Sequence, residues 1–145
     1  MNTFHVHPRS AELQVVVQGR LRTEMVPENG VLDGQGNRRT IRNDVGLFDM
    51  VPFYQGSFHT QFNPDCADAI FVASFPSEDP GTGQVLDQTL AFSDDIISAA
   101  SGQSIAGEDI DAIRGAIPAS IAAGVDECLQ RCGLQKKAPL YTPLR

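Results

Sequence analysis

Three histidines occur in the 145-residue chain, and they stand in only two short segments. His5 and His7 lie in FHVHPRSAELQVVVQG, and His59 follows much later in GSFHTQFN. Side chains two positions apart in a strand point to the same face, so His5 and His7 would direct both imidazole rings to one point. Glu12 lies just beyond a short turn that contains Pro8 and is the natural carboxylate partner. The spacing predicts a strand-built interior in which these three histidines and Glu12 form a metal site.

Short runs with strand character alternate with turn residues through the first half of the chain. Residues 12–17 (ELQVVV) are an apolar run typical of a buried strand, and residues 68–75 (DAIFVASF) indicate the most clearly buried strand of all. Residues 27–37 are rich in Gly, Asn and Asp and predict a turn, while Pro52 disfavours a central position for a strand over residues 46–54. Further strands are expected over residues 21–26, 38–43 and 59–63. Many short strands joined by turns favour a β-sandwich or barrel.

Beyond the loop sequence PSEDPGTG the pattern becomes helical. Residues 93–95 (SDD) supply a cap and first-turn acids for a helix that continues to about residue 100. A second helical stretch is expected from residue 108 to residue 132, restarted or kinked at Pro118. Gly133 is well placed to end it as the C′ residue.

One apolar stripe follows the second helical stretch, and we expect it to cover the barrel or a neighbouring subunit. Its members are Ile110, Ile113, Ile117, Ile121, Val125 and Leu129. The chain is therefore predicted to form a β-barrel core over residues 1–92, a C-terminal helical hairpin over residues 93–134 and a basic tail over residues 135–145.

The charge and the hydropathy pattern exclude several classes of partner. The net charge of −7 argues against nucleic acids and anionic membranes. No apolar run approaches the ~18–20 residues that a membrane-spanning helix needs. The segment MNTFHVHPRS has no apolar core of the kind found in secretory leaders, so no signal peptide is expected in this chain.

Three cysteines leave an odd count. Cys128 and Cys132 are one helical turn apart, a poor arrangement for a bond between them. Cys66 is expected to reach one of the two, with a free thiol left over or a partner outside this chain, and three buried thiols are the alternative. No cysteine stands beside a histidine at metal-site spacing, so a zinc–thiolate site is not expected.

The two histidine segments resemble the two motifs of the cupins in their germin form. The first motif, H-x-H-x4-E-x6-G, falls on residues 5–19, and the second, G-x2-H-x3-N, falls on residues 56–63. Longer stretches, among them VPENGVLDGQGNRR, YQGSFHTQFNPDC and IPASIAAGVDECLQRCG, are similar to the fungal germin and spherulin-like branch. The resemblance covers nearly the whole chain. It implies a mainly β cupin jelly-roll barrel, a helical extension and an extracellular location.

The chain departs from the family pattern at two places. The first motif usually begins with a glycine six residues before the first histidine, and only four residues precede His5. The second motif usually has a proline two residues before its glycine, where this chain has Tyr54. We therefore expect a barrel that lacks N-terminal strands and leaves sheet edges and apolar faces open.

Three neutral imidazoles and one carboxylate make a ligand set of total charge −1 that is harder than a thiolate site. Mn(II) suits such a set and Fe(II) suits it nearly as well, whereas raw affinity would favour Cu(II) or Zn(II). An octahedral ion would keep two positions for water or substrate. The resemblance implies manganese bound by His5, His7, Glu12 and His59.

Three functions are compatible with the resemblance: a manganese-binding protein of spherulin type, an oxidoreductase that acts on oxalate or superoxide, and a cupin isomerase or cyclase. A single motif pair argues against the two-cupin oxalate decarboxylases. The substrate-orienting asparagines of germin oxalate oxidases lie upstream of the H-x-H, a region that we expect this chain to lack, and Asn63 more naturally supports the barrel. We therefore favour a metal-binding germin-like protein of undetermined activity, with a small carboxylate as its possible ligand.

Alternation along the strands places Val15, Val17, Phe62 or Phe71 near the metal. The cavity there is expected to be mainly apolar and not lined by Arg or Lys. Because germin-like proteins form oligomers in which helical extensions clasp the neighbouring subunit, we also expect a homo-oligomer, at least a dimer, with the helical hairpin in the interface.

Overall fold

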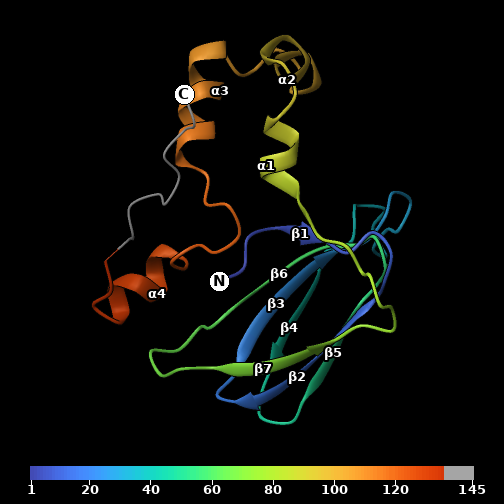
Figure 1. Cartoon of the computed structure of the whole chain (residues 1–145), viewed down its shortest axis with the longest axis vertical. Coiled ribbons are helices and arrows are strands. Elements are labelled where there is room, and N and C mark those ends of the chain that lie inside the picture. The colour runs from blue at the N-terminus through green and yellow to red at the C-terminus, as the bar shows by residue number, and fades with distance from the viewer. Residues whose placement is uncertain (136–145) are drawn as a thin grey trace.

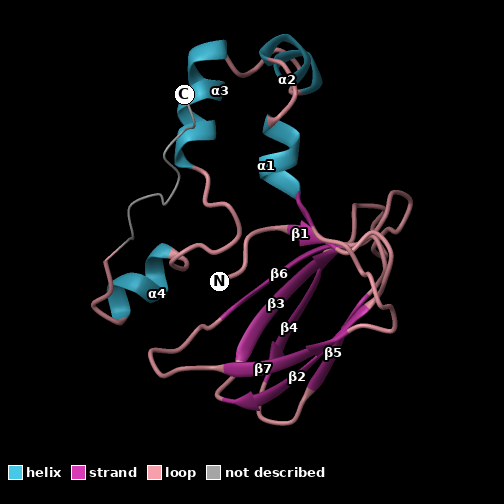
Figure 2. Cartoon of the chain, in the orientation of Figure 1, coloured by secondary structure: helices cyan, strands magenta, loops and turns pink. Residues whose placement is uncertain are grey.

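The computed structural model describes residues 1–135, which form eight strands and four short helices (Figures 1 and 2). The strands are β1 (His5–Val6), β2 (Glu12–Gln18), β3 (Leu21–Val26), β4 (Ile41–Val45), β5 (Met50–Phe53), β6 (Phe58–Phe62), β7 (Ile70–Ser74) and β8 (Gly83–Gln84). The helices are α1 (Val85–Leu90), α2 (Asp94–Ala100), α3 (Gly107–Ala116) and α4 (Asp126–Arg131). The mainly β architecture predicted from the sequence is confirmed, and the expected tail lies, apart from residue 135, outside the described residues.

The strands form two antiparallel sheets. One has five strands in the order β4-β3-β6-β1-β8, and the other has three in the order β5-β2-β7. The buried apolar core draws on both sheets, which therefore face each other: Val16, Leu21, Met25, Val45, Val51 and Phe53. Pro52 lies in the edge strand β5, as its missing N–H requires.

The expectation that residues 68–75 form the most buried strand is wrong. Strand β7 is an edge strand, and four of its five residues are exposed. Ile70 and Val72 are 50% and 56% exposed. An apolar sequence is compatible with a strand buried on both faces, but it does not show that a second layer is present. The described part of the chain provides no layer that covers the outer face of this sheet. Strand β4 is also displaced from the predicted residues 38–43, because residues 32 and 38 instead form an isolated bridge across the turn.

Helices α1, α2 and α3 lie above β1 in Figure 1, and α4 lies at their lower left, on the side of the N-terminus. Helix α2 matches the helix expected from residue 93 to about residue 100, whereas the helical stretch expected over residues 108–132 is broken into α3 and α4. The apolar stripe is not continuous, because α3 ends at Ala116 and residues 117–125 are not helical. Ile117 has extended backbone angles, φ −70° and ψ 127°, as the steric demand of the following Pro118 favours. The segment then returns to the N-terminal residues through a bridge between Asn2 and Ile121. Helix α1 and strand β8 were not predicted.

A disulfide between Cys66 and Cys132 joins the loop after β6 to the end of α4, and Cys128 keeps a free thiol. Of the two partners that the sequence left open for Cys66, the structure has Cys132. Gly133 follows with φ +64°, a left-handed conformation suited to glycine as the C′ residue. No helix in the described part of the chain combines the length and apolar character needed to cross a membrane.

Candidate metal centre

The four predicted ligands come together in the interior between the sheets. His5, His7, Glu12 and His59 are all buried, and one potential ligand atom from each lies within 4.8 Å of all the others. The structure therefore groups the residues that the sequence singled out. That they bind a metal stays a prediction.

Strand pairing explains how distant segments reach one point. His5 in β1 lies directly opposite His59 in β6, and His7 follows two residues later on the same face. Glu12 is the first residue of β2, in the other sheet. The site thus spans both sheets, and it forms only when they close on each other.

Each imidazole is held by a backbone carbonyl at its Nδ1 atom. The three bonds run from His5 to the Thr3 oxygen (2.9 Å), from His7 to the Gly81 oxygen (2.6 Å) and from His59 to the Ser57 oxygen (3.0 Å). A carbonyl oxygen only accepts hydrogen bonds, so each Nδ1 must carry the proton. In its neutral form each ring then directs the lone pair of Nε2 to the interior, the arrangement that metal-binding histidines use.

The Nε2 atoms face the carboxylate of Glu12. Oε2 of Glu12 lies 3.0 Å from Nε2 of His7 and 3.1 Å from Nε2 of His59. Two lone-pair acceptors at this distance repel each other unless a proton or a metal ion lies between them, and without a metal the contact between His59 Nε2 and Glu12 Oε2 has hydrogen-bond geometry. Three nitrogens and one carboxylate oxygen are a donor set that suits a divalent first-row ion. The residues present therefore fit the metal that the motifs imply.

Burial and hydrogen bonding set the charge states of two ligands. Desolvation is the largest influence on His5 and lowers the pKa of its imidazole, which favours the neutral ring that a metal needs. For Glu12 burial is the largest influence and acts to raise the pKa, but the hydrogen bonds that the carboxylate accepts from His59 and Gln14 in the metal-free chain outweigh it, so the pKa lies below its usual value. Glu12 is therefore ionised at neutral pH.

Aromatic rings support the histidines from the side. Phe53 stacks on His59 with the ring centroids 4.3 Å apart and the planes inclined by 18°. Phe75 meets His7 edge-on at 4.7 Å. These contacts restrict rotation of the imidazoles and exclude water from one side of the site.

A cavity of about 260 Å³ adjoins His5, His7 and Glu12. Phe71 lines it as predicted, but the expectation for Val15 and Val17 is wrong. The inward face of β2 carries Glu12, then Gln14 and Val16. The turn at Pro8 thus sets the register one residue away from the one expected. Among the described residues, the rest of the wall combines apolar and polar side chains and includes no Arg or Lys: Asn2, Gln61, Ala73, Phe75, Thr82, Gln84, Ser120 and Ile121.

The polar residues of this wall were not named as site residues from the sequence, and two of them show why. Asn2, upstream of His5, lines the cavity. Its position depends on the bridge to Ile121, which nothing in the local sequence indicates. Gln61 lies two residues after His59 on the same inward face, a signal that strand alternation does provide.

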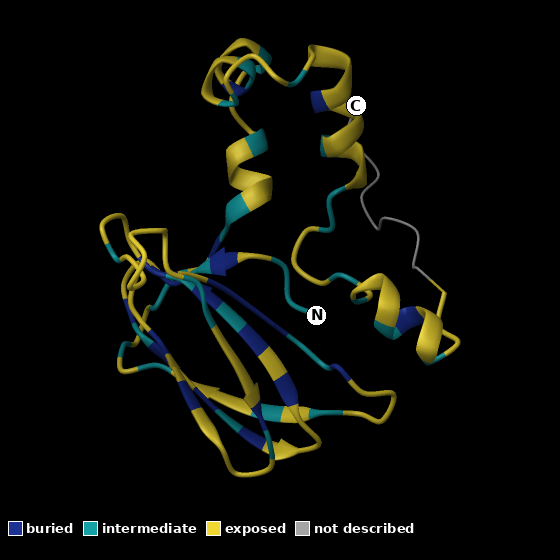
Figure 3. Cartoon of the chain, turned by 180° about the vertical axis from the view of Figure 1, so that it is seen from behind, coloured by how far each residue is buried: buried dark blue, intermediate teal, exposed yellow. Residues whose placement is uncertain are grey.

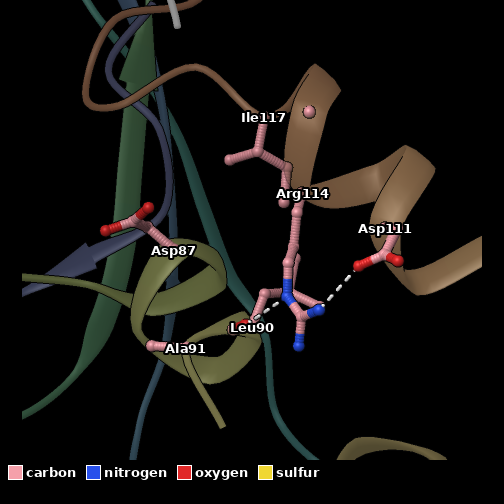
Figure 4. A pocket seen from close by; sticks show the side chains of 7 residues that line it. Asp87, Leu90, Ala91, Asp111, Arg114 and Ile117 are labelled. Carbon is pink, nitrogen blue, oxygen red and sulfur yellow. Dashed lines mark hydrogen bonds and ion pairs between the residues drawn. The ribbon is translucent and has the colours of Figure 1, made fainter. Parts of the chain in front are cut away.

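A larger hollow of about 570 Å³ lies away from the histidines, between α1 and α3 (Figure 4). The guanidinium of Arg114 crosses it and donates to the backbone oxygens of Leu90 and Phe92, at 2.7 and 2.8 Å. The same group pairs with Asp94 and Asp111. Because its charge and donors are engaged within the chain, Arg114 joins the helices and is not available to recognise a ligand there.

Comparison with known proteins places these features in a family. The Cupin family model matches residues 1–104. Spherulin-1B of Physarum polycephalum is 28% identical over 134 residues, which are 92% of this chain and 51% of that protein. Germin-like protein subfamily 2 member 3 of Arabidopsis thaliana is 33% identical over 123 residues, 81% of this chain and 51% of that protein. The chain thus spans about half the length of these relatives.

Solved structures show the same fold. A recombinant oxalate oxidase in complex with glycolate superposes with a TM-score of 0.65 at 23% identity, over 77% of this chain and 54% of that chain. An oxalate decarboxylase from Bacillus subtilis superposes with a TM-score of 0.56 at 25% identity, over 75% of this chain and 26% of that chain. The two facing sheets are therefore those of a jelly-roll barrel.

Proposed function

The chain belongs to the cupin family, in its germin-like branch, and on that premise we propose that it binds a divalent first-row metal ion, manganese in the first place, through His5, His7, Glu12 and His59. The observation that carries the proposal is the orientation of the three imidazoles. Each has Nδ1 bound to a carbonyl, so Nε2 of all three rings is directed to a common point beside an ionised carboxylate, where a metal would replace the hydrogen bond between His59 and Glu12. Fe(II) is the nearest alternative for such a donor set.

The chain's own residues prepare the site for this ion. Backbone carbonyls and aromatic rings fix the imidazoles, and Glu12 supplies the negative charge that offsets part of the charge of a divalent cation. A bound manganese ion would supply Lewis-acid and one-electron chemistry to a small ligand at its open positions. Asn2 and Gln61 are placed on the cavity wall, where they can donate hydrogen bonds to an anionic oxygen.

A second candidate is a manganese-dependent oxidoreductase of the oxalate oxidase or superoxide dismutase type. The polar groups of Asn2 and Gln61 beside the ligands favour it, since a purely storage site needs no such groups. The size of the cavity, about 260 Å³, suits a small dicarboxylate and disfavours the larger substrate of an isomerase or cyclase.

Metal analysis of the purified protein tests the proposal. We expect close to one equivalent of manganese or iron per chain, and His7→Ala should remove it because one of three nitrogen donors is lost. Thr23→Val is a matched control, since Thr23 is buried in β3 but is not among the grouped ligands. Full occupancy in His7→Ala, or no metal in the parent protein after manganese loading, would contradict the assignment. An activity panel with oxalate and superoxide then separates the two candidates.

We propose in addition that the protein is extracellular and that its chains associate. The disulfide between Cys66 and Cys132 supports the location, because such bonds persist in oxidising compartments. Exposed apolar side chains support the association, since large apolar patches usually mark interfaces. They lie on the outer face of the β5-β2-β7 sheet and on the C-terminal segment: Leu13, Val17, Met50, Val72, Ile113 and Ile121. Figure 3 marks the exposed residues of the chain in yellow.

A further inference from the structure

We propose that Gln14 is a positioning residue that fixes how Glu12 meets the metal, so that Glu12 binds through Oε2 alone and keeps Oε1 out of the coordination sphere. The inference rests on the proposed metal-binding function and concerns a residue outside the four ligands. It is carried by the hydrogen bonds and the burial of the Gln14 side chain.

The two oxygens of Glu12 have different partners. Oε2 faces Nε2 of His7 and Nε2 of His59, at 3.0 and 3.1 Å. Oε1 accepts a hydrogen bond of 2.6 Å from Nε2 of Gln14. A bond to an ionised acceptor is stronger than one between neutral groups, so this contact holds the carboxylate in one orientation. Only Oε2 is then directed to the point where the imidazoles converge.

Gln14 is in place because of strand alternation. It lies two residues after Glu12 in β2, on the same inward face, with 0% of its surface exposed. The side chain thus reaches back along the strand to the ligand that precedes it. No other side chain in the described part of the chain is recorded as a hydrogen-bond donor to Oε1.

Packing does not account for a glutamine at this position. The Oε1 atom of Gln14 is buried without a hydrogen-bond partner among the described residues. Leaving such a group unsatisfied is unfavourable, and an apolar side chain of the same length would fill the space without that penalty. The amide N–H that reaches Glu12 is the one property of Gln14 that an apolar residue lacks.

Holding one oxygen aside has a consequence for the metal. A carboxylate that binds with both oxygens takes two positions on the ion, and one that binds with a single oxygen takes one. By engaging Oε1, Gln14 keeps a position open for water or a small ligand next to the cavity. It therefore acts on the number of open positions without touching the metal.

The test compares Gln14→Met with the parent protein and with Thr23→Val. Methionine keeps the length of the side chain and removes the donor. Thr23→Val removes another buried oxygen that has no hydrogen-bond partner among the described residues, and therefore no hydrogen bond to Glu12. Manganese affinity is measured by titration calorimetry on the whole chain. The coordination mode is measured by infrared difference spectroscopy, because the separation of the two carboxylate stretching bands is larger for one-oxygen than for two-oxygen binding.

We expect the bands of the parent protein to show one-oxygen binding, and Gln14→Met to shift them toward two-oxygen binding. Manganese should bind Gln14→Met about 10-fold to 100-fold more weakly, as for other residues that orient a metal ligand, and Thr23→Val should leave both readouts unchanged. The role of Gln14 would be overturned by two-oxygen binding in the parent protein or by unchanged affinity and bands in Gln14→Met. It would also be overturned if Thr23→Val lost as much manganese affinity as Gln14→Met. Failure of the proposed function is distinguishable, because the parent protein itself would then take up no metal. The infrared measurement on the parent still tests the one-oxygen binding of Glu12 even if Gln14→Met does not fold.

Discussion

The bond between Cys66 and Cys132 makes a prediction whose size follows from the structure. It joins residues 66 positions apart. In the chain-entropy model, closing a loop of this length in the unfolded state stabilises the folded protein by about 4 kcal/mol at 25 °C. With an unfolding entropy of about 2 cal/mol/K per residue, the 145-residue chain should lose about 14 °C of melting temperature when the bond is absent.

The bond also determines what covers the metal cavity. It fastens the end of α4 to the loop after β6, where the Arg131 guanidinium donates to the Pro64 oxygen. The preceding segment contributes Ser120 and Ile121 to the cavity wall. All four candidate ligands belong to the barrel, on residues 5–59. Loss of the bond should therefore loosen the wall and leave the metal stoichiometry unchanged.

Scanning calorimetry on the Cys66→Ser/Cys132→Ser double variant provides the measurement, with metal analysis on the same samples. Cys128→Ser is the matched control, because Cys128 is a free thiol on the same helix and its replacement keeps the disulfide. The reasoning would be refuted if the melting temperature of the double variant fell by less than about 3 °C. It would also be refuted if the melting temperature of Cys128→Ser fell as far as that of the double variant. Loss of metal with an otherwise folded barrel would refute the second part.

Three further predictions follow from individual residues. Phe53→Ala should lower the free energy of unfolding by about 3–5 kcal/mol, because the ring is buried and large-to-small changes in a core are of this size. A loss below about 1 kcal/mol in urea denaturation would contradict this magnitude. The same variant should bind the metal more weakly, since the ring stacks on His59. The pKa of His5 lies below its usual 6.5, so the unfolded chain takes up a proton there before the folded one does. The free energy of unfolding of the metal-free protein should therefore fall as the pH falls below 6.5, by at most about 1.4 kcal/mol per pH unit from this group, and a rise over that interval in urea titrations would be the contrary result. Ile113→Glu should dissociate the proposed oligomer in sedimentation experiments; Ile113 is 40% exposed in the single chain, so an unchanged sedimentation coefficient would place the interface elsewhere.

The grouping of His5 with His7 among the candidate ligands could be predicted because its signal is local. Histidines at positions 5 and 7 share a face in any strand, because side chains alternate with a period of two residues whatever the rest of the fold. The register after Pro8 could not be predicted in the same way. The number of residues in a turn decides which side chains of the next strand point inward. A shift of one residue moves Val15 and Val17 from the cavity to the outer face.

The burial of β7 was mispredicted because the apolar run carries no information on neighbours. IFVAS would suit the middle of a sheet covered on both sides, but β7 pairs only with β2 in the described chain. The same missing information affected the helices. The end of α3 before Pro118 follows from local sterics, whereas the return of Ile121 to Asn2 is a long-range pairing without a sequence period.

The hydrogen bond that orients His7 shows why the spacing of the candidate ligands in the sequence does not by itself form the candidate metal centre. Its Nδ1 atom donates to the carbonyl of Gly81, which comes from the loop before β8. Arg9 holds that loop in place, since its guanidinium pairs with Asp79 and its backbone N–H donates to the Pro80 oxygen. Gly81 has φ +66°, and a Cβ atom there would lie 2.7 Å from the Arg9 guanidinium. The orientation of a ligand two residues before Arg9 therefore depends on a glycine more than seventy positions later. Because the anchors of His5 and His59 lie in two other segments, a fully oriented site requires the closed barrel, and metal binding should stabilise the fold as a whole.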